Sequence, residues 1–344
     1  MRRLLLFLFL LILAAGGWTA YLLLAPYKGF SGSGIIVDVP KGDSVRGIAR
    51  LLEQQGVIRN RYSFILLARR SANRKLEAGE YYFTQPQTPS QVFDTIASGR
   101  IFEVSITVPE GFNTLQIAEL LSQNALVDKD EFIAATKDIS SIRDFAPAAP
   151  SVEGFLFPST YEFPHHVSAQ EVIATMTAHF RAEWASLTAV DPASDGRSVQ
   201  QVVTLASLVE SETPKQAERP LVARVFLNRL KIGLPMQCDP TVIYALELAG
   251  KYDPPLTSAD LRYDSSYNTY RHPGLPPGPI TNPGEASLRA ALVPAAVDYL
   301  YFVADTQGGH LFSSTLAEHN RNVARYRQLL SQHNGRNPAP SHNP

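Results

Sequence analysis

The stretch VDVPKGDSVRGIARLLEQQGVI (residues 37–58) returns later in the chain as ITVPEGFNTLQIAELLSQNALV (106–127). Both copies contain the turn Val-Pro-x-Gly, after which apolar residues recur at intervals of three and four positions. This spacing predicts a short strand, a tight turn and a helix with one apolar face in each copy. The repeat therefore favours a mixed α+β fold built in part from two versions of one small unit.

The first copy is predicted to form a β-α-α-β unit over residues 35–100. A second helix is expected at about 62–69, and the strand GEYYFT at 79–84 completes the unit. This outline resembles the LysM type of glycan-binding module, although a plain packing unit would have the same outline. Residues 101–150 are expected to hold the second repeat unit and a connector, which ends in the breaker-rich segment DFAPAAPS (144–151).

The chain begins with Arg2 and Arg3, which precede an uninterrupted apolar run over residues 4–25. As a helix this run would be about 33 Å long, which is enough to cross the hydrocarbon core of a bilayer. The two arginines should stay in the cytoplasm (residues 1–3), so that the rest of the chain is exported. A cleaved signal peptide is the alternative. A Gly/Ser-rich linker is expected at 26–34.

The composition excludes several functional classes. Lysine plus arginine (31) nearly balance aspartate plus glutamate (32), so no nucleic-acid partner is expected. The single cysteine, Cys238, can form neither an internal disulfide nor a cysteine-based zinc cluster. His165 and His166 are adjacent, and no H-E-x-x-H or comparable ligand spacing occurs. The sequence therefore predicts no metal site and no cofactor.

The predicted helix that begins near Ser198 contains the candidate catalytic residue, Glu210. This glutamate lies at the border of an apolar stripe, and no basic residue lies one helical turn before or after it. Partial burial without a countercharge would raise its pKa, as a general acid requires. A surface glutamate near a helix end is the alternative. Glu212 lies on a different face and is expected to be solvated.

The following segments are expected to surround this glutamate. Thr213 is predicted to cap a second helix that stops at Gly233, and Asp239 to cap a third helix. A stiff, proline-rich loop covers residues 265–284. The residues predicted to bind a sugar, through amide, hydroxyl, carboxylate and aromatic groups, are Gln237, Asp239, Asn268, Thr269 and Tyr270. A mixed α/β catalytic domain is thus expected over 151–333, followed by a disordered tail at 334–344.

Several long motifs of the C-terminal half stand in a recognisable order. They are LASLVESET (205–213), VFLNRL (225–230), CDPTVIYAL (238–246), YNTYRHPGLPPGPITNPG (267–284), YLYFVAD (299–305) and HLFSSTLAEHN (310–320). Their order and spacing resemble the YceG-like family of endolytic murein transglycosylases, and the resemblance covers nearly the whole chain. It implies an enzyme of the bacterial inner membrane, with its catalytic domain in the periplasm, that cuts nascent peptidoglycan strands close to peptidoglycan synthases. It also implies that Glu210 is the single catalytic glutamate.

One glutamate is enough for a lytic transglycosylase, although glycosidases generally use two carboxylates. The C6 hydroxyl of N-acetylmuramic acid attacks its own C1 and gives a 1,6-anhydro end, so no protein nucleophile is needed. Two alternatives stay open. A hydrolytic muramidase would use Asp239 or Asp253 as a second carboxylate, and a non-catalytic, membrane-tethered glycan-binding scaffold would give Glu210 a merely structural role.

Overall fold

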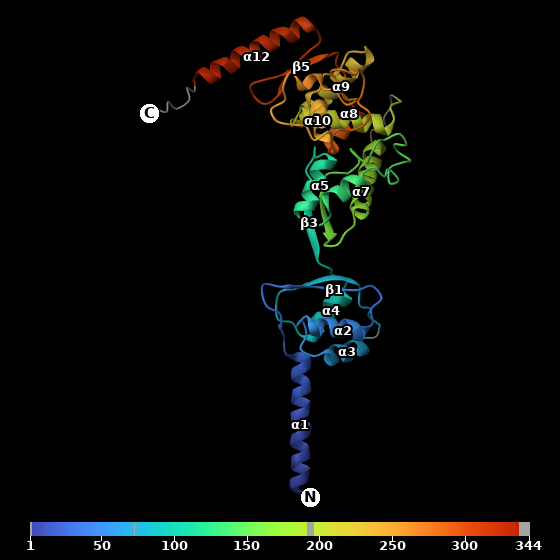
Figure 1. Cartoon of the computed structure of the whole chain (residues 1–344), viewed down its shortest axis with the longest axis vertical. Helices are drawn as coiled ribbons and strands as arrows, with labels where there is room; N and C mark the ends of the chain where they lie inside the picture. Colours follow the sequence, from blue (N-terminus) through green and yellow to red (C-terminus); the bar gives the residue numbers. More distant parts are fainter. Residues whose placement is uncertain (1, 72, 191–195, 337–344) are drawn as a thin grey trace. The chain divides into compact units, whose positions relative to one another are not determined.

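The computed structural model describes residues 2–71, 73–190 and 196–336 and divides into two compact units (Figure 1). Unit 1 comprises residues 1–105 together with the short segment 162–166. Unit 2 comprises residues 106–161 and everything from 167 onward. The backbone therefore passes from one unit to the other at three places, namely 105/106, 161/162 and 166/167.

The first element is helix α1 (Arg2–Leu24), and its segment Leu4–Leu24 has a mean hydropathy of 2.1. Among the described residues it is the one helix that is long and apolar enough to cross a membrane. Within Leu4–Leu24 none of the residues is buried inside the protein, as expected for a helix that lipid would surround. The predicted N-terminal apolar helix is confirmed, and it suits either a membrane anchor or a signal sequence.

Unit 1 has the strand and helix order that the sequence predicts. Its elements are β1 (Ile35–Val39), α2 (Val45–Gln54), α3 (Arg61–Arg70), β2 (Gly79–Phe83) and α4 (Pro89–Ala97). Strands β1 and β2 are antiparallel, with Ile35 opposite Phe83 and Val39 opposite Gly79. The β-α-α-β order is confirmed, whereas its likeness to LysM modules stays a prediction.

The core of unit 1 forms where these elements turn their apolar sides toward one another. Alternate residues of β1, Val37 and Val39, are buried, and Leu52 of α2, Phe64 of α3 and Tyr81 of β2 meet them. The predicted linker at 26–34 is tied to this core. Tyr27 exchanges backbone hydrogen bonds of 2.9 and 3.1 Å with Gln87, and the Gly29 N–H donates to the Gly56 carbonyl at 2.8 Å.

The second copy of the repeat has the same local structure as the first. Strand β3 (Glu103–Thr107), which pairs with β4 (Thr160–Pro164), leads through the turn into helix α5 (Thr114–Gln123). Gly42 and Gly111 occupy equivalent turns with φ angles of 80° and 81°, a region that glycine adopts without steric strain. The sequence repeat is therefore confirmed as a strand, turn and helix that occurs twice.

Unit 2 is mainly helical and is organised around α8. Besides α5 it contains α6 (Lys129–Ala135), α7 (Ala169–Val190), α8 (Val199–Glu212), η1 (Gln216–Glu218), α9 (Arg219–Lys231), α10 (Asp239–Leu248), η2 (Asp260–Arg262), α11 (Glu285–Leu292), β5 (Tyr301–Ala304), β6 (His310–Ser313) and α12 (Leu316–Arg336). Every residue from Val202 to Val209 is buried, because α9, α10 and α11 all pack against α8. The single apolar stripe expected from the sequence underestimates this burial.

Three local expectations for unit 2 are wrong. Thr213 is the C-cap of α8 rather than an N-cap, and α9 begins at Arg219 with a proline in its first turn. The N-cap of α10 is Cys238, so Asp239 is the first residue of that helix. Helix α12 continues to Arg336 into the expected tail, and residues 337–344 of that tail lie outside the described residues.

Candidate active site

A polar cavity of about 330 Å³ lies at the C-terminal end of α8. The end of α8, helix α9, the loop and first residue of α10, the loop 265–284, β5 and α12 each contribute to its wall. The lining residues are Glu212, Arg229, Met236, Gln237, Asp239, Tyr270, Phe302 and His319. We call this cavity the Glu212 pocket. Its wall combines a carboxyl, an amide, a phenol and an aromatic ring, which are the groups that bind sugars.

The pocket contains two carboxyls, Glu212 and Asp239, and no ion pair is formed by either of them among the described residues. Burial raises the pKa of Glu212, and the nearby charge of Asp239 raises it further. The Cys238 thiol and the more distant charges of His310 and Arg229 oppose this shift. The expectation that Glu212 is solvated is wrong, because α12 and the loops around α10 cover the face that a helical wheel leaves open.

Glu210, the predicted catalytic residue, has a different environment. Its Oε1 lies 2.8 Å from Nη2 of Arg219, and each of these side chains is only 5% exposed. Its Oε2 accepts a hydrogen bond of 3.0 Å from the Gly284 N–H. Burial raises the pKa of Glu210, whereas the Gly284 N–H and the Arg219 charge lower it. Burial is the largest of these effects, so the pKa of Glu210 is raised overall, although Arg219 gives this carboxyl an ion-pair partner.

The premise that no cation reaches Glu210 is therefore wrong. Arg219 opens the next helix, so it does not appear among the residues one turn away along α8. The turn of the second repeat completes the surroundings of Glu210. A Cβ built on Gly111 would lie 3.6 Å from Glu210 Cγ, and Oε2 of Glu110 lies 3.6 Å from Nη1 of Arg219. Glu210 thus lies where the end of α8, the start of α9 and the turn of the second repeat pack together in unit 2.

Three of the predicted sugar-binding residues line the Glu212 pocket. The Tyr270 hydroxyl donates a hydrogen bond to Oδ1 of Asp239. Gln237 has a φ angle of 55°, a left-handed conformation that costs energy for a residue other than glycine and that is enriched at functional sites. The structure therefore brings Gln237, Asp239 and Tyr270 together with Glu212, whereas Glu210 does not line this pocket.

The other two predicted sugar-binding residues are buried beneath the pocket. The Asn268 amide donates hydrogen bonds to the carbonyls of Leu261 (3.1 Å) and Tyr263 (2.7 Å). The Thr269 hydroxyl accepts a hydrogen bond of 3.0 Å from the Cys238 N–H and lies 2.9 Å from the Thr241 hydroxyl. These contacts fix the loop that carries Tyr270, so Asn268 and Thr269 act as positioning residues.

Arg229 is a site residue that the sequence analysis missed. Its Nε donates to the Leu300 carbonyl at 2.7 Å, and its Nη1 donates to the carbonyls of Met236 (2.7 Å) and Pro235 (3.0 Å). Burial lowers the pKa of this guanidinium. Arg229 thereby ties α9 to β5 and to the loop that carries Gln237. The sequence did contain a signal for it, because Arg229 lies on the face of the VFLNRL helix that carries the apolar residues.

Glu153 is a second buried carboxyl that the sequence analysis did not single out. It accepts hydrogen bonds from the Thr114 N–H (2.9 Å), the Thr114 hydroxyl (2.8 Å), the Tyr244 hydroxyl (3.2 Å) and the Asn282 amide (2.9 Å). Burial raises the pKa of Glu153 to about 7, although the bonds from Thr114 and Tyr244 lower it. These hydrogen bonds connect the start of α5 to α10 and to the loop that precedes α11. Glu153 therefore has a structural role.

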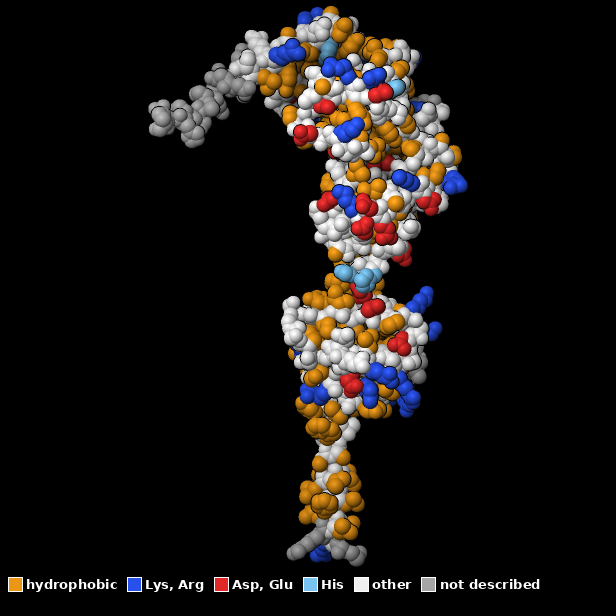
Figure 2. All heavy atoms as spheres, viewed as in Figure 1, with side chains coloured by type: hydrophobic (Ala, Val, Ile, Leu, Met, Phe, Trp, Pro, Cys, Tyr) orange, Lys and Arg blue, Asp and Glu red, His pale blue; other side chains and the backbone are white. Residues whose placement is uncertain are grey.

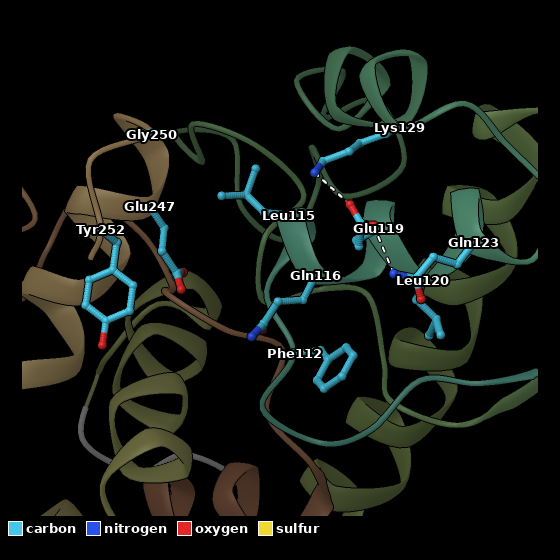
Figure 3. Close-up of a pocket in the computed structure, with 10 residues that line it drawn as sticks. All are labelled: Phe112, Leu115, Gln116, Glu119, Leu120, Gln123, Lys129, Glu247, Gly250 and Tyr252. Atoms are coloured by element: carbon cyan, nitrogen blue, oxygen red, sulfur yellow. Dashed lines mark hydrogen bonds and ion pairs between the residues drawn. The ribbon is translucent and has the colours of Figure 1, made fainter. Parts of the chain in front are cut away.

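A larger cavity of about 630 Å³ in unit 2 contains two carboxyls (Figure 3). Its lining residues are Phe112, Leu115, Gln116, Glu119, Leu120, Gln123, Lys129, Glu247, Gly250 and Tyr252. Glu119 pairs with Lys129 at 2.7 Å, and its pKa is lowered by this partner. Burial raises the pKa of Glu247, whereas a hydrogen bond of 2.7 Å from the Asn113 amide lowers it. The Glu212 pocket, in contrast, places its carboxyl beside three of the predicted sugar-binding residues.

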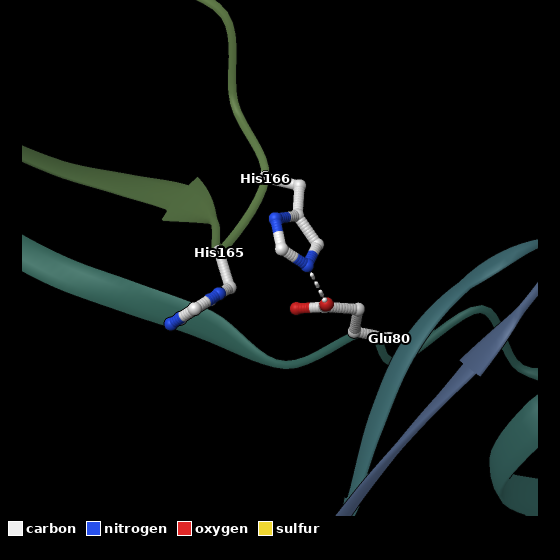
Figure 4. A group of neighbouring side chains, drawn as sticks. All are labelled: Glu80, His165 and His166. Carbon is white, nitrogen blue, oxygen red and sulfur yellow. Dashed lines mark ion pairs between the residues drawn. The ribbon is translucent and has the colours of Figure 1, made fainter. Parts of the chain in front are cut away.

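One group of histidine and acidic side chains in the described part of the chain could share a metal ion (Figure 4). The ligand atoms of Glu80, His165 and His166 lie within 4.8 Å of one another, and His166 Nε2 lies 2.9 Å from Glu80 Oε1. All three residues belong to unit 1, whereas the Glu212 pocket belongs to unit 2. This group is therefore no part of the candidate active site.

The chain is thus an α+β protein with an apolar N-terminal helix of membrane-crossing length and, in unit 2, a polar pocket that contains a half-buried carboxyl with a raised pKa. The comparison with known families identifies the class of protein. The sequence profile of the YceG-like family matches residues 37–325, and the chain belongs to this family.

Named relatives and a solved structure resemble most of the chain. The endolytic murein transglycosylase of Bacillus subtilis (strain 168) is 33% identical over 88% of this chain and 88% of its own length. The protein of the same name from Streptococcus pneumoniae (strain ATCC BAA-255 / R6) is 29% identical over 92% of this chain, which spans 64% of that protein. The crystal structure of a YceG-like protein from Listeria monocytogenes has a TM-score of 0.57 at 33% identity, covering 85% of this chain and 99% of that one.

Proposed function

We propose that this protein is an endolytic murein transglycosylase, which cleaves the bond between N-acetylmuramic acid and N-acetylglucosamine within peptidoglycan strands and leaves 1,6-anhydro ends. The observation that carries the proposal is the Glu212 pocket, in which a half-buried carboxyl with a raised pKa and no ion-pair partner in the described part of the chain lies among groups that bind sugars. The similarity to transglycosylases named as such, over about nine-tenths of the chain, gives the reaction class.

In this proposal Glu212, rather than Glu210, is the catalytic acid and base. A general acid must hold a proton near neutral pH, which requires burial without a countercharge. The pKa of Glu212 is raised by burial, and Glu212 forms no ion pair among the described residues, although the charges of His310 and Arg229 oppose part of this rise. The pKa of Glu210 is also raised by burial, but Arg219 forms an ion pair with it at 2.8 Å and opposes that rise. Glu210 then acts as a structural residue that fixes the end of α8, from which Glu212 projects.

The proton follows a short cycle in this arrangement. Protonated Glu212 donates to the departing glycosidic oxygen, and the resulting carboxylate then accepts the proton of the muramic acid C6 hydroxyl as that oxygen bonds to C1. The attacking oxygen belongs to the substrate, so its effective concentration is high and no protein nucleophile is required. Gln237, Asp239 and Tyr270 orient the sugar, and Arg229 holds the loop that presents Gln237.

The hydrolytic alternative depends on Asp239. This carboxylate lies in the same pocket as Glu212, but the Tyr270 hydroxyl occupies one of its oxygens. Asp253, the other residue considered for this role, is exposed and does not line the pocket. A transglycosylase needs neither residue as a nucleophile, whereas a muramidase needs one carboxylate beside the acid to activate water or to attack C1.

Product analysis separates these alternatives. Purified glycan strands are digested with the full chain in detergent, and the new ends are identified by mass spectrometry. Anhydro ends are expected, and Asp239→Asn should still form them at a reduced rate. Reducing ends that disappear in Asp239→Asn would establish a muramidase instead. A wild-type chain that binds strands without cutting them would be the non-catalytic scaffold.

The proposed location follows from α1. Arg2 on its N-terminal side and its length favour an uncleaved anchor with a cytoplasmic N-terminus and both units on the outer face of the inner membrane. A tethered enzyme meets strands that are still close to the membrane, where peptidoglycan synthases extend them. Cutting there would end elongation, so synthases are the proposed partners.

A further inference from the structure

Unit 1 contains a second cavity of interest, which lies between α2 and α3 and has a volume of about 590 Å³. Its lining residues are Arg46, Arg50, Arg61, Tyr62, Ile65, Leu66 and Arg69. We call it the arginine pocket. An adjoining cavity of about 680 Å³ shares Arg46, Ile65 and Arg69 with it and adds further basic residues, Arg74 and Lys75. Together the two cavities form a basic surface on unit 1.

Most of the charge in the arginine pocket is uncompensated. Arg61 lies 3.7 Å from Glu53, but Arg46, Arg50 and Arg69 form no ion pair within the part of the chain that the structure describes. Arg46 and Arg50 lie one turn apart on α2, where like charges destabilise a helix. An anion bound between them would remove this repulsion. Arginine also binds phosphate through two parallel hydrogen bonds, which favours a phosphate group as the ligand.

The pocket belongs to the unit that holds the end of the membrane-type helix. Helix α1 contacts α3 and α4. The guanidinium of Arg59 lies over two aromatic rings, 4.9 Å from the ring centre of Tyr21 and 4.6 Å from that of Tyr27. Trp18 and Tyr21 form an aromatic pair at this end of α1, and such residues sit at the level of the lipid headgroups.

Basic side chains gather at the edge of unit 1 from which α1 leaves (Figure 2). Two exposed apolar side chains accompany them in the arginine pocket. Tyr62 is 65% exposed and Leu66 is 45% exposed. A cationic surface with exposed aromatic and aliphatic side chains is the composition that binds an anionic membrane surface, because the cations attract phosphates while the apolar groups enter the interface.

We propose that the arginine pocket binds the phosphate groups of anionic phospholipids in the membrane that α1 crosses. The proposal rests on the membrane anchoring proposed above and is independent of the reaction at Glu212. Arg46, Arg50 and Arg69 supply the phosphate contacts, and Leu66 and Tyr62 contact the interfacial part of the lipid. The lipid then forms a second tether, which fixes the rotation of unit 1 about α1 and holds α2 and α3 against the bilayer.

The test uses the full chain in nanodiscs of phosphatidylcholine mixed with phosphatidylglycerol. Lipids retained by the protein after detergent release are counted by native mass spectrometry. The wild-type chain should retain phosphatidylglycerol in excess of its share of the bilayer. Arg46→Gln/Arg50→Gln/Arg69→Gln should lower this enrichment on the order of tenfold, and high salt should lower it in the wild type.

A matched control removes three exposed arginines from unit 2, as Arg321→Gln/Arg325→Gln/Arg327→Gln, and should leave the enrichment unchanged. Co-elution of each variant with the nanodisc reports α1 insertion separately, and circular dichroism reports folding. Equal retention of the two lipids by a folded, inserted wild-type chain would overturn the proposal. So would an enrichment that survives in the triple variant of the arginine pocket, or preferential retention of added glycan strands there.

Discussion

The last turn of α8 carries two glutamates, Glu210 and Glu212, that the fold places in opposite environments. On one side Glu210 meets a buried guanidinium and a backbone N–H, and the second repeat closes over it. On the other side Glu212 opens into a pocket with no ion-pair partner among the described residues. Both carboxyls are largely buried, and burial raises the pKa of both. The two carboxyls differ in their partners, because an ion pair with Arg219 opposes this rise at Glu210.

The segments of unit 2 that surround Glu210 also differ from those that surround Glu212. The Glu210 side is closed by the Gly111 turn and by the loop of Asn282, which exchange backbone hydrogen bonds of 3.0 and 2.9 Å through Gly111 and Phe112. The Glu212 side is formed by loops held from beneath by Asn268, Thr269 and Arg229. One side holds the helix end in place, and the other presents its last carboxyl to a ligand.

The cleavage rates of Glu212→Gln and Glu210→Gln give the strongest test of the difference between the two glutamates. Glu212→Gln removes the proposed acid and base and should lower the cleavage rate on the order of 10² to 10⁴-fold, with little change in thermal stability. Glu210→Gln should act mainly on stability and retain much of its rate where it is folded. Initial rates on purified strands, measured beside thermal unfolding, check both. A folded Glu210→Gln without activity beside an active Glu212→Gln would restore the original assignment.

Replacement of Arg219 tests its ion pair with Glu210. Arg219→Met keeps the length of the side chain but leaves Glu210 as an unpaired buried charge, which should destabilise unit 2 by about 3 to 5 kcal/mol. Adding Glu210→Gln to Arg219→Met should recover part of this loss, because no buried charge is then left alone. Denaturant unfolding of the single and double variants measures the recovery. Strict additivity of the two losses would contradict a direct pair.

The pH dependence of stability tests the surroundings of Glu210 in another way. Glu153 accepts a hydrogen bond from Asn282, which belongs to the loop beside Glu210. Its folded-state pKa of about 7 lies above the ordinary value of 4.5. Its contribution is therefore fully present below about pH 4.5 and is lost as the pH rises through 7, a change on the order of 3 kcal/mol. Wild type should lose this stability between these limits, and Glu153→Gln should not. Parallel unfolding curves of the two proteins against pH would exclude the effect.

The smallest expected effect concerns the pH profile of cleavage. Because the first step needs protonated Glu212, activity should fall as the pH rises through its raised pKa. Asp239→Asn removes a neighbouring negative charge that raises this pKa, so the alkaline limb should move to lower pH. Rates between pH 5 and 9 for the wild type and Asp239→Asn give the shift. A limb that stays in place would show that Asp239 does not act on Glu212.

Local patterns of the sequence predict much of this structure. The repeat, the β-α-α-β order and the apolar N-terminal helix all depend on neighbours within one segment, and all three are present. The environments of Glu210 and Glu212 depend on residues that a helical wheel does not contain. Arg219 reaches Glu210 from the next helix, and Tyr270 and Phe302 enclose Glu212 from distant loops and strands. The sequence identified the motif, but the surroundings of its two carboxyls could be compared only in the tertiary structure.

The loop 265–284 also shows that a sequence pattern does not reveal the tertiary surroundings of a side chain. Its residue types predicted a stiff segment that offers sugar-binding groups, and Tyr270 of this loop does line the Glu212 pocket. The sequence could not tell which polar side chains face outward, because an asparagine that bonds to backbone carbonyls and one that would bind a sugar have the same side chain. Burial of Asn268 and Thr269 assigns both to the support of the loop.

The three passages of the backbone between the units have a consequence for proteolysis. A single cleavage between residues 105 and 106 would not by itself separate the N-terminal fragment from the rest of the chain, because unit 1 also includes residues 162–166, with His166 2.9 Å from Glu80. The two cleaved pieces would stay associated through this inserted segment until it dissociated. Separation of the pieces would therefore depend on the stability of a five-residue insertion as much as on access of a protease to residues 105 and 106.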